Sequence, residues 1–176
     1  VTVSKQMSGT YNTFFKAVEN LSAGKEKFTI IDSKTNSGAQ GLVVLKAAEE
    51  IAAGKSFEEI VKSVEETIKR TRIYVSVPTL EYMYKSGRIG KAQQIALNMI
   101  NMKPVVSIDE NGDGIIIGKA FSTKGNTKKI SELVKDIIRS NENKAGIIYC
   151  ATRKEVDGLY LYLKDLGYDV YWYEQE

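Results

Sequence analysis

The apolar positions in the first part of the chain alternate between strand-like runs and helical spacing. From Tyr11 to Val18 they recur at i, i+3, i+4 and i+7, which is the spacing of one helical face. In chain order, the pattern predicts a strand end at 1–4, a helix from Ser8, a strand at 28–32, helices over 41–54 and after Ser56, and a strand at 73–77. Strands that alternate with helices are typical of a parallel or mixed sheet covered by helices.

Two local signals set the ends of these helices. Gly54 follows the periodic run and predicts a helix end, because glycine adopts the left-handed backbone that closes a helix. The run Ser56-Phe57-Glu58-Glu59 is a capping box, in which the serine and the last glutamate each bond the backbone of the other. Behind it, the apolar residues keep to one helical face.

Pro78, one of only two prolines, marks the predicted boundary between two domains, 1–77 and 78–176. Beyond it the pattern predicts a short helix at 79–87, a helix at 89–101, a hairpin at 104–121 that turns at Asn111-Gly112, a helix at 126–140, a strand at 146–151, a helix from the Thr152 capping box to Gly167, and a strand at 169–173. The predicted fold is α/β. A partial first domain with a helix-covered sheet precedes a second, smaller α/β domain.

Composition adds little to this fold but excludes several functions. The 176 residues are 43% hydrophobic and 27% charged, which suits a globular protein with a real core. The net charge of +3 is too small to favour nucleic acid as a partner. No apolar run approaches the roughly 18 residues of a membrane span, and no signal segment leads the chain, so we expect a cytoplasmic protein.

The chain contains no histidine and a single cysteine, Cys150. Histidine-based triads, histidine metal ligands and histidine acid–base steps are therefore excluded. One cysteine cannot form a disulfide within the chain, which fits a reducing compartment. Cys150 stands inside an apolar run, more typical of a small core residue than of a nucleophile. We expect neither a metal nor a cofactor.

The first candidate site is the cluster Ser8-Gly9-Thr10, where a strand is predicted to turn into a helix. One interpretation is a helix cap, because serine and threonine oxygens accept hydrogen bonds from the free N–H groups of the first turn. The other is a cradle for a phosphate or carboxylate at the positive end of the helix dipole. The spacing alone favours the cap, and the two interpretations are compatible.

Two further candidates lie in loops. Asp32-Ser33 and the polar stretch 34–41 follow the end of a predicted strand, where open α/β sheets place ligands, although a plain surface loop explains them equally well. Arg88 stands in a tight turn and could hold a carboxylate or phosphate in two hydrogen bonds. The spacing favours a simpler interpretation of Arg88, a cation at the end of a helix. The acidic turn at Asn111-Gly112 resembles a calcium loop only superficially, and a hairpin explains it.

Three segments of the chain together resemble the DegV family of bacterial fatty-acid-binding proteins. They are SGTYNTFFKA (8–17), FTIIDSKTNSGAQG (28–41) and VPTLEYMYKSGRIGKAQQIALNMINMKPVVSID (77–109). The last segment is the most specific, and the order and approximate spacing of all three match the family. The resemblance covers nearly the whole chain. Family members carry a further strand and a Thr-Ser-x-Pro-Ser loop before the Ser-Gly-Thr turn, so the chain resembles an N-terminally truncated member, and we expect its N-terminal boundary to be artificial.

The resemblance implies a two-domain α/β carrier for a long-chain fatty acid, and no catalysis by the carrier itself. The acyl chain would lie in an apolar slot, and the carboxylate would be presented to a partner fatty acid kinase that serves phospholipid metabolism. Ser8 would contact the carboxylate, while Gly9 and Thr10 would shape the turn. Ser33 would lie by the same sheet edge, and Arg88 would supply the cation near the head group.

Two other functions stay open at this point. The chain could be part of a dihydroxyacetone-kinase-like phosphotransferase, although the sequence lacks a nucleotide-binding loop. It could also be a non-catalytic interaction domain with a vacant cleft.

Overall fold

A computed structural model describes residues 1–89, 102–140, 160–161 and 164–165. Contacts divide the chain into two compact units, Val1–Lys144 and Ala145–Glu176. In the second unit the four described residues are helical, and Lys164 Nζ lies 5.4 Å from the centre of the Tyr160 ring. Several predicted features lie wholly or largely outside the described residues: the helix at 89–101, the strand at 146–151 with Cys150, the Thr152 capping box with most of its helix, and the strand at 169–173.

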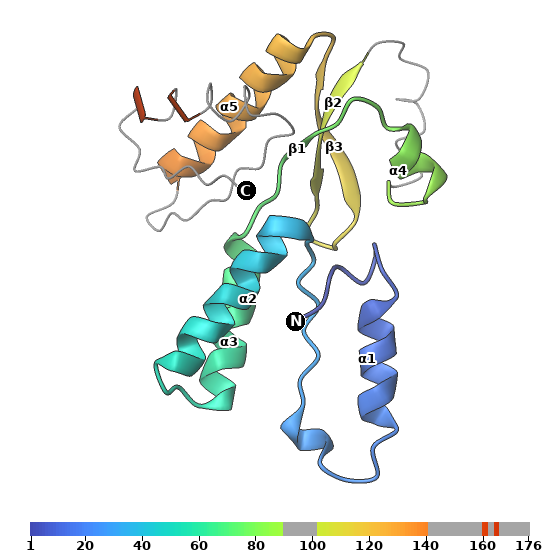
Figure 1. The fold of residues 1–176 in the computed structure, drawn as a ribbon, viewed down its shortest axis with the longest axis vertical. Coiled ribbons are helices and arrows are strands. Elements are labelled where there is room, and N and C mark those ends of the chain that lie inside the picture. Colours follow the sequence, from blue (N-terminus) through green and yellow to red (C-terminus); the bar gives the residue numbers. More distant parts are fainter. Residues whose placement is uncertain (90–101, 141–159, 162–163, 166–176) are drawn as a thin grey trace, which may run out of the picture. The chain divides into compact units, whose positions relative to one another are not determined.

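The first unit contains five α-helices, one 3₁₀ turn and three strands among its described residues (Figure 1). In chain order they are α1 (Thr10–Glu19), η1 (Lys25–Lys27), α2 (Ser37–Ala52), α3 (Phe57–Arg70), β1 (Val75–Ser76), α4 (Glu81–Lys85), β2 (Lys103–Ile108), β3 (Gly114–Ala120) and α5 (Thr123–Ser140). This mixture confirms the predicted α/β class. None of the helices in the described part of the chain has the length and apolarity that a bilayer crossing requires.

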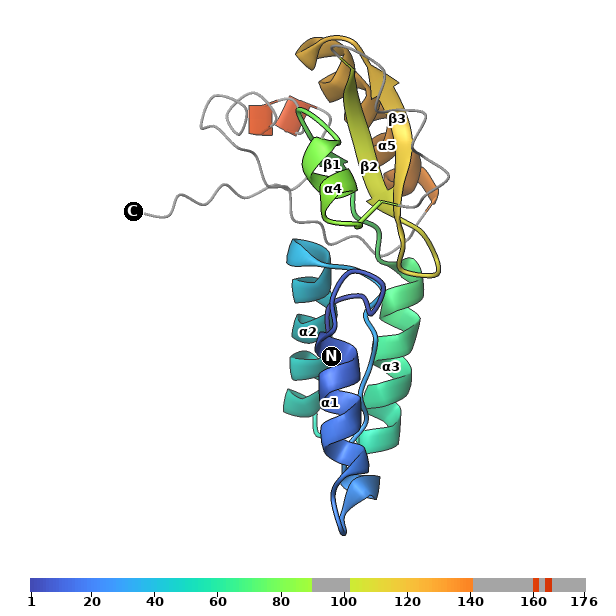
Figure 2. The same cartoon turned by 90° about the vertical axis from the view of Figure 1, so that its right-hand side faces the viewer.

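Helices α2 and α3 pack side by side, as both views show (Figures 1 and 2). The predicted helix end at Gly54 is confirmed, because this glycine has a φ of 72° directly after the last turn of α2. The capping box is also confirmed: Ser56 Oγ accepts from the N–H of Glu59, and the Glu59 carboxylate accepts from the N–H of Ser56. Helix α2 begins at Ser37, four residues earlier than its predicted start.

The three strands form an antiparallel sheet in the order β1-β2-β3. The predicted hairpin is confirmed, and Gly112 at its turn has a φ of 94°. Val75 of β1 pairs with Val106 of β2, so the segment just before Pro78 joins the sheet formed after it. The domain boundary near Pro78 stays a prediction.

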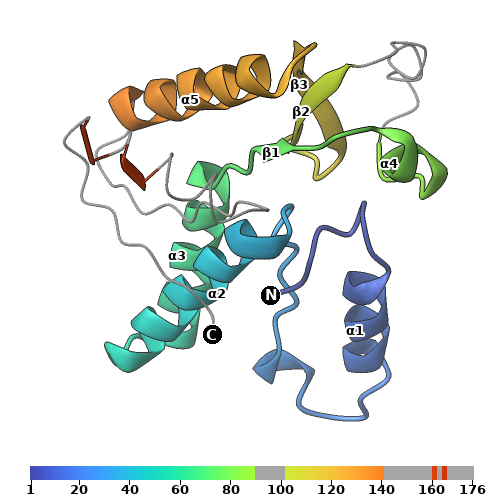
Figure 3. The same ribbon diagram turned by 45° about the horizontal axis from the view of Figure 1, so that its top comes forward.

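Helices α4 and α5 pack near this sheet (Figure 3). Val106 of β2 lies in an apolar cluster with Leu80, the residue just before α4, and Met102. Its neighbour Val105 is fully buried. The side chains of Val105 and of Lys129 from α5 both lie against Gly118 of β3. Because successive strand residues point to opposite faces, the hairpin carries apolar contacts on both of its faces.

Parallel pairing occurs at one place in the described residues, the isolated bridge between Thr2 and Asp32. The predicted strand at 28–32 is therefore an extended segment rather than a regular strand. A strand needs a neighbour along its whole length, and here the pairing covers a single residue, while the side chain of Phe28 is 55% exposed. Among the described residues, α1 also lacks a buried side chain, although Tyr11 stacks on Phe15 at 6.0 Å.

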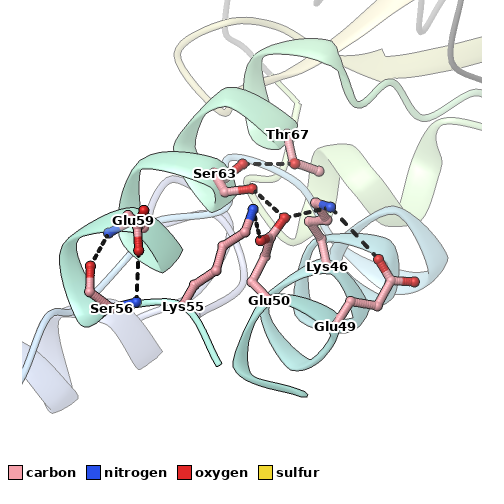
Figure 4. A network of polar contacts seen from close by, with 8 residues as sticks. All are labelled: Lys46, Glu49, Glu50, Lys55, Ser56, Glu59, Ser63 and Thr67. Carbon is pink, nitrogen blue, oxygen red and sulfur yellow. Dashed lines mark hydrogen bonds and ion pairs between the residues drawn. The ribbon is translucent and has the colours of Figure 1, made fainter. Parts of the chain in front are cut away.

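A buried carboxylate links α2 to α3 (Figure 4). The Glu50 side chain is 5% exposed and forms ion pairs with Lys46, at 2.6 Å, and with Lys55. It also accepts a hydrogen bond of 3.0 Å from Ser63 Oγ of α3. The hydrogen bonds from Lys46 and Lys55 lower the pKa of the Glu50 carboxyl from 4.5 to about 2, and the same contact raises the pKa of Lys55. The carboxylate is therefore bound on three sides in its charged form.

Replacing Glu50 with glutamine is expected to lower the thermal unfolding midpoint by several degrees at neutral pH, because the two lysines lose the negative charge that they pair with and one acceptor oxygen becomes an NH2 donor. The folded-state pKa of Glu50 lies below the unfolded value, so its stabilisation is complete above about pH 4.5 and is lost as the pH falls towards 2. The difference between wild type and Glu50→Gln should shrink across this range. Circular dichroism melts at each pH measure it.

Glu49→Gln is the matched control. Glu49 is the preceding residue and its side chain is exposed, and its contact with Lys46, at 3.9 Å, is longer than the 2.6 Å contact of Glu50. A midpoint for Glu50→Gln that equals that of Glu49→Gln at neutral pH would show that the buried network contributes nothing to stability.

Candidate functional site

Ser4 joins three segments of the chain that are distant in sequence. It is fully buried, and its backbone N–H donates to the carbonyl of Thr35 at 2.9 Å. Its carbonyl accepts from the N–H groups of Met7 and Ser8, at 3.0 and 3.1 Å. Its hydroxyl donates to the carbonyl of Gly112 at 2.7 Å. Ser4 therefore fixes the turn before Ser8 against both the 32–35 loop and the hairpin turn.

The Ser8-Gly9-Thr10 cluster forms the start of α1, as predicted, but with a different cap. Gly9 is the N-cap residue, and Ser8 Oγ, one residue earlier, accepts from the N–H of Thr10 at 3.3 Å. The two hydroxyl groups of Ser8 and Thr10 lie 2.8 Å apart. The N–H groups of Tyr11 and Asn12 have no partner among the described residues. Two hydroxyls and two free N–H groups thus gather at the positive end of the α1 dipole.

Arg88 reaches this turn from a segment 80 residues further along the chain. Gly87, with a φ of 68°, ends α4 as predicted, and the N–H of Arg88 closes the turn on the carbonyl of Met83 at 2.9 Å. Arg88 Nε then donates to the carbonyl of Met7 at 3.3 Å. The terminal nitrogens of the guanidinium have no partner in the described residues, so its planar fork can accept a ligand.

A cleft of about 200 Å³ lies at this junction. Its walls come from the turn before Ser8, the end of α4 and the hairpin turn: Gln6, Met7, Gly87, Arg88, Ile89, Asp113 and Gly114. Gly114 packs so closely on the carbonyl of Arg88 that a Cβ atom there would collide with it. The cleft therefore brings Arg88 and the residues just before Ser8 together with the hairpin turn, whereas Ser8, Gly9 and Thr10 do not line it, and their contact with a ligand stays a prediction.

Ser33 lies on the inner side of the same region, with 1% of its surface exposed. Its hydroxyl donates to the carbonyl of Thr35 at 3.2 Å and accepts from the N–H of Thr35 at 3.3 Å. Ser33 therefore shapes the loop that holds Ser4, and its direct contact with a ligand stays a prediction. In the same loop Asp32 Oδ2 and Thr35 Oγ1 are buried without a hydrogen-bond partner in the described residues.

The acidic residues of the hairpin turn hold the turn itself. Asp109 Oδ1 accepts from the N–H groups of Asn111 and Asp113, both at 2.9 Å. The described residues contain no group of three or more His, Cys, Asp and Glu side chains that could hold a metal ion. These hydrogen bonds are those of the predicted hairpin turn.

Sequence reasoning missed Ser4, Gln6, Met7 and Asp113 as members of this region. Ser4 stood in a predicted strand end, and Asp113 in a predicted turn, where polar residues are ordinary. The contacts that bring Ser4 and Met7 to this region span more than 80 residues, and no local pattern encodes them.

Comparison with known proteins gives the family. The family model that matches residues 1–174 is described as an uncharacterised protein of the DegV family. The chain belongs to the DegV family. A DegV domain-containing protein of Clostridium acetobutylicum is 32% identical over 94% of this chain and 58% of its own length. The chain spans 46% to 58% of the length of the curated DegV relatives it matches.

Two solved DegV structures have the same fold as this chain. A fatty acid binding DegV family protein of Streptococcus agalactiae is 25% identical, with a TM-score of 0.78 over 93% of this chain and 57% of that chain. A DegV family protein of Eubacterium eligens, loaded with heptadecanoic acid, is 27% identical, with a TM-score of 0.65 over 77% of this chain and 50% of that chain. These likenesses confirm the resemblance that the three sequence segments predicted.

Gly112→Ala is expected to be markedly more destabilising than Gly54→Ala, the matched control. Both glycines have a positive φ, which costs alanine about 1–2 kcal/mol. The space around Gly54 is empty within 4 Å, whereas a Cβ atom at Gly112 would collide with the hydroxyl of Ser4. This overpacking should add about 1–3 kcal/mol. Urea unfolding measures both free energies, and equal values would contradict the packing of Ser4 against the hairpin turn.

Proposed function

We propose that this protein binds a long-chain fatty acid and is a carrier rather than an enzyme. The observation that supports this most is the hydrogen bond from Arg88 to the carbonyl of Met7, which places a guanidinium beside the Ser8 turn. The solved relative from Eubacterium eligens, described as loaded with heptadecanoic acid, supports the choice of ligand.

The donors at this junction match the needs of a carboxylate. Arg88 lines the cleft and offers its open fork, and the start of α1 offers its free N–H groups and the one hydroxyl of the Ser8–Thr10 pair that does not donate to the other. A carboxylate taken out of water must be hydrogen-bonded, and ideally paired with a cation. Gly9 keeps this approach open, because no atom lies within 4 Å of the position of its missing Cβ.

The size of the cleft suits a head group rather than a whole lipid. Its volume of about 200 Å³ is below the roughly 300–1,000 Å³ of pockets that enclose a drug-sized ligand. The acyl tail therefore extends beyond these residues. Each buried CH2 contributes about 0.8 kcal/mol, so the tail supplies most of the affinity and the head-group contacts supply orientation. Ser33 supports this arrangement from behind, through the loop that holds Ser4.

The carrier presents the carboxylate to a partner protein, a cytoplasmic fatty acid kinase. The side chain of Arg88 is exposed, and so are Gly9 and Thr10, so a carboxylate bound here stays within reach of a second protein. Chemistry on the carboxylate then takes place in the partner, and this chain needs neither a metal nor a cofactor of its own.

Delipidated protein mixed with oleate and analysed by native mass spectrometry tests the carrier function. We expect one retained oleate per chain, and an oleate affinity for Arg88→Ala that is about 10–100-fold weaker, since a hydrogen bond to a charged group contributes about 1.5–3 kcal/mol. Lys85→Ala is the control, because Lys85 is an exposed cation of α4 that pairs with Glu81 and does not line the cleft.

Three outcomes would count against the proposal. Nucleotide binding without lipid binding would favour a phosphotransferase part, and binding of neither would favour an interaction domain. Equal oleate affinities for Arg88→Ala, Lys85→Ala and the wild type would exclude Arg88 from the head-group site.

A further inference from the structure

Asp113 places a negative charge at the cleft that already contains Arg88. Both residues line it, and they are the two charged residues among its seven lining residues. They form no ion pair with each other in the described part of the chain, and the carboxylate of Asp113 has no hydrogen-bond partner there.

The backbone holds Asp113 firmly at this place. Its N–H donates to Asp109 Oδ1 at 2.9 Å, and its carbonyl accepts from the N–H of Asp109 at 2.9 Å. The next residue, Gly114, packs directly on the carbonyl of Arg88, so the turn and the arginine are in contact. On its other side Gly112 accepts the hydroxyl of Ser4. Asp113 therefore cannot move away from the cleft without breaking contacts on both sides.

We propose that Asp113 determines the head-group charge that the cleft accepts: it admits a singly charged carboxylate and disfavours a doubly charged phosphate. This inference rests on the proposed function and deepens it. Arg88 and Asp113 together carry no net charge, so one additional negative charge is tolerated when the fork of Arg88 binds it directly. A phosphate head group carries about −1.5 to −2 at pH 7 and meets the repulsion of Asp113 with its extra charge.

This difference in affinity determines which lipid the carrier releases more readily. A fatty acid whose carboxylate has been phosphorylated carries the disfavoured head group, while an unmodified fatty acid carries the favoured one. The modified lipid therefore leaves the cleft more readily than the unmodified lipid, and a new fatty acid replaces it. The backbone at both charged residues is held by hydrogen bonds, at Asp113 within the hairpin turn and at Arg88 in the turn after α4.

Competition between two probes of equal chain length tests the inference. Dissociation constants for hexadecanoate and hexadecyl phosphate are measured at pH 7.4 and fixed ionic strength for wild type, Asp113→Asn and Glu110→Gln. Glu110 is an exposed carboxylate of the same turn that does not line the cleft. Its replacement removes one negative charge, as Asp113→Asn does, but leaves the lining of the cleft unchanged. Asp113→Glu, which keeps the charge, is a second control.

We expect wild type to prefer hexadecanoate by at least about tenfold. Asp113→Asn should reduce this preference by about tenfold, mainly through tighter binding of hexadecyl phosphate, while Glu110→Gln and Asp113→Glu retain it. If Asp113→Asn fails to fold, Asp113→Ser removes the same charge with a residue that suits turns. If the folded Asp113→Asn or Asp113→Ser variant keeps the wild-type preference for hexadecanoate, the proposed role of Asp113 is wrong, while the proposed function still stands. Failure of the wild type to bind hexadecanoate overturns the proposed function and this inference together.

Discussion

The buried hydroxyl and backbone of Ser4 are the constraint on which the rest of the candidate site depends. A fully buried serine must satisfy its polar atoms inside the protein, and Ser4 does so with Thr35, Met7, Ser8 and Gly112 at once. These bonds tie three segments to the same point, because Met7 and Ser8 belong to one turn. The Ser8 turn, the 32–35 loop and the hairpin turn therefore have fixed positions relative to one another before any ligand binds. Such preorganisation reduces the entropy that binding would otherwise cost.

Much of the local structure could be predicted from the sequence because its causes are local. The Ser56 capping box and the helix ends at Gly54 and Gly87 each depend on a few neighbouring residues, and all are confirmed. The start of α2 was predicted too late. Ser37 enters that helix with a φ of 48°, a backbone that a serine rarely adopts, so the polar stretch before it looked like a longer loop. The pairing of β1 with β2 was also beyond prediction, because β1 finds its partner some 30 residues away.

The candidate site, too, could be predicted from the sequence only in part. Ser8 and Arg88 could be proposed from their turns and from the resemblance to the DegV family, and the hydrogen bond between Arg88 and Met7 brings their segments together. Ser33 was proposed as a ligand contact on its position after a strand, yet its hydroxyl is occupied by Thr35. Asp113 was interpreted only as a turn residue. Its neighbour Arg88 is 25 positions earlier in the chain, and only the packed hairpin reveals that they share a cleft.

The bond between Ser4 and Gly112 joins residues 108 positions apart, and this separation has a consequence for how the protein matures. Loops of that length close late, after the local helices and the hairpin have formed. On a ribosome that adds roughly 5–20 residues per second, Gly112 emerges about 5–20 s after Ser4. During that interval the Ser4 hydroxyl lacks its acceptor, the Gly112 carbonyl, and the turn before Ser8 is not yet held against the hairpin. A nascent chain therefore carries helices well before its candidate site is complete, and this site is among the last parts to be assembled.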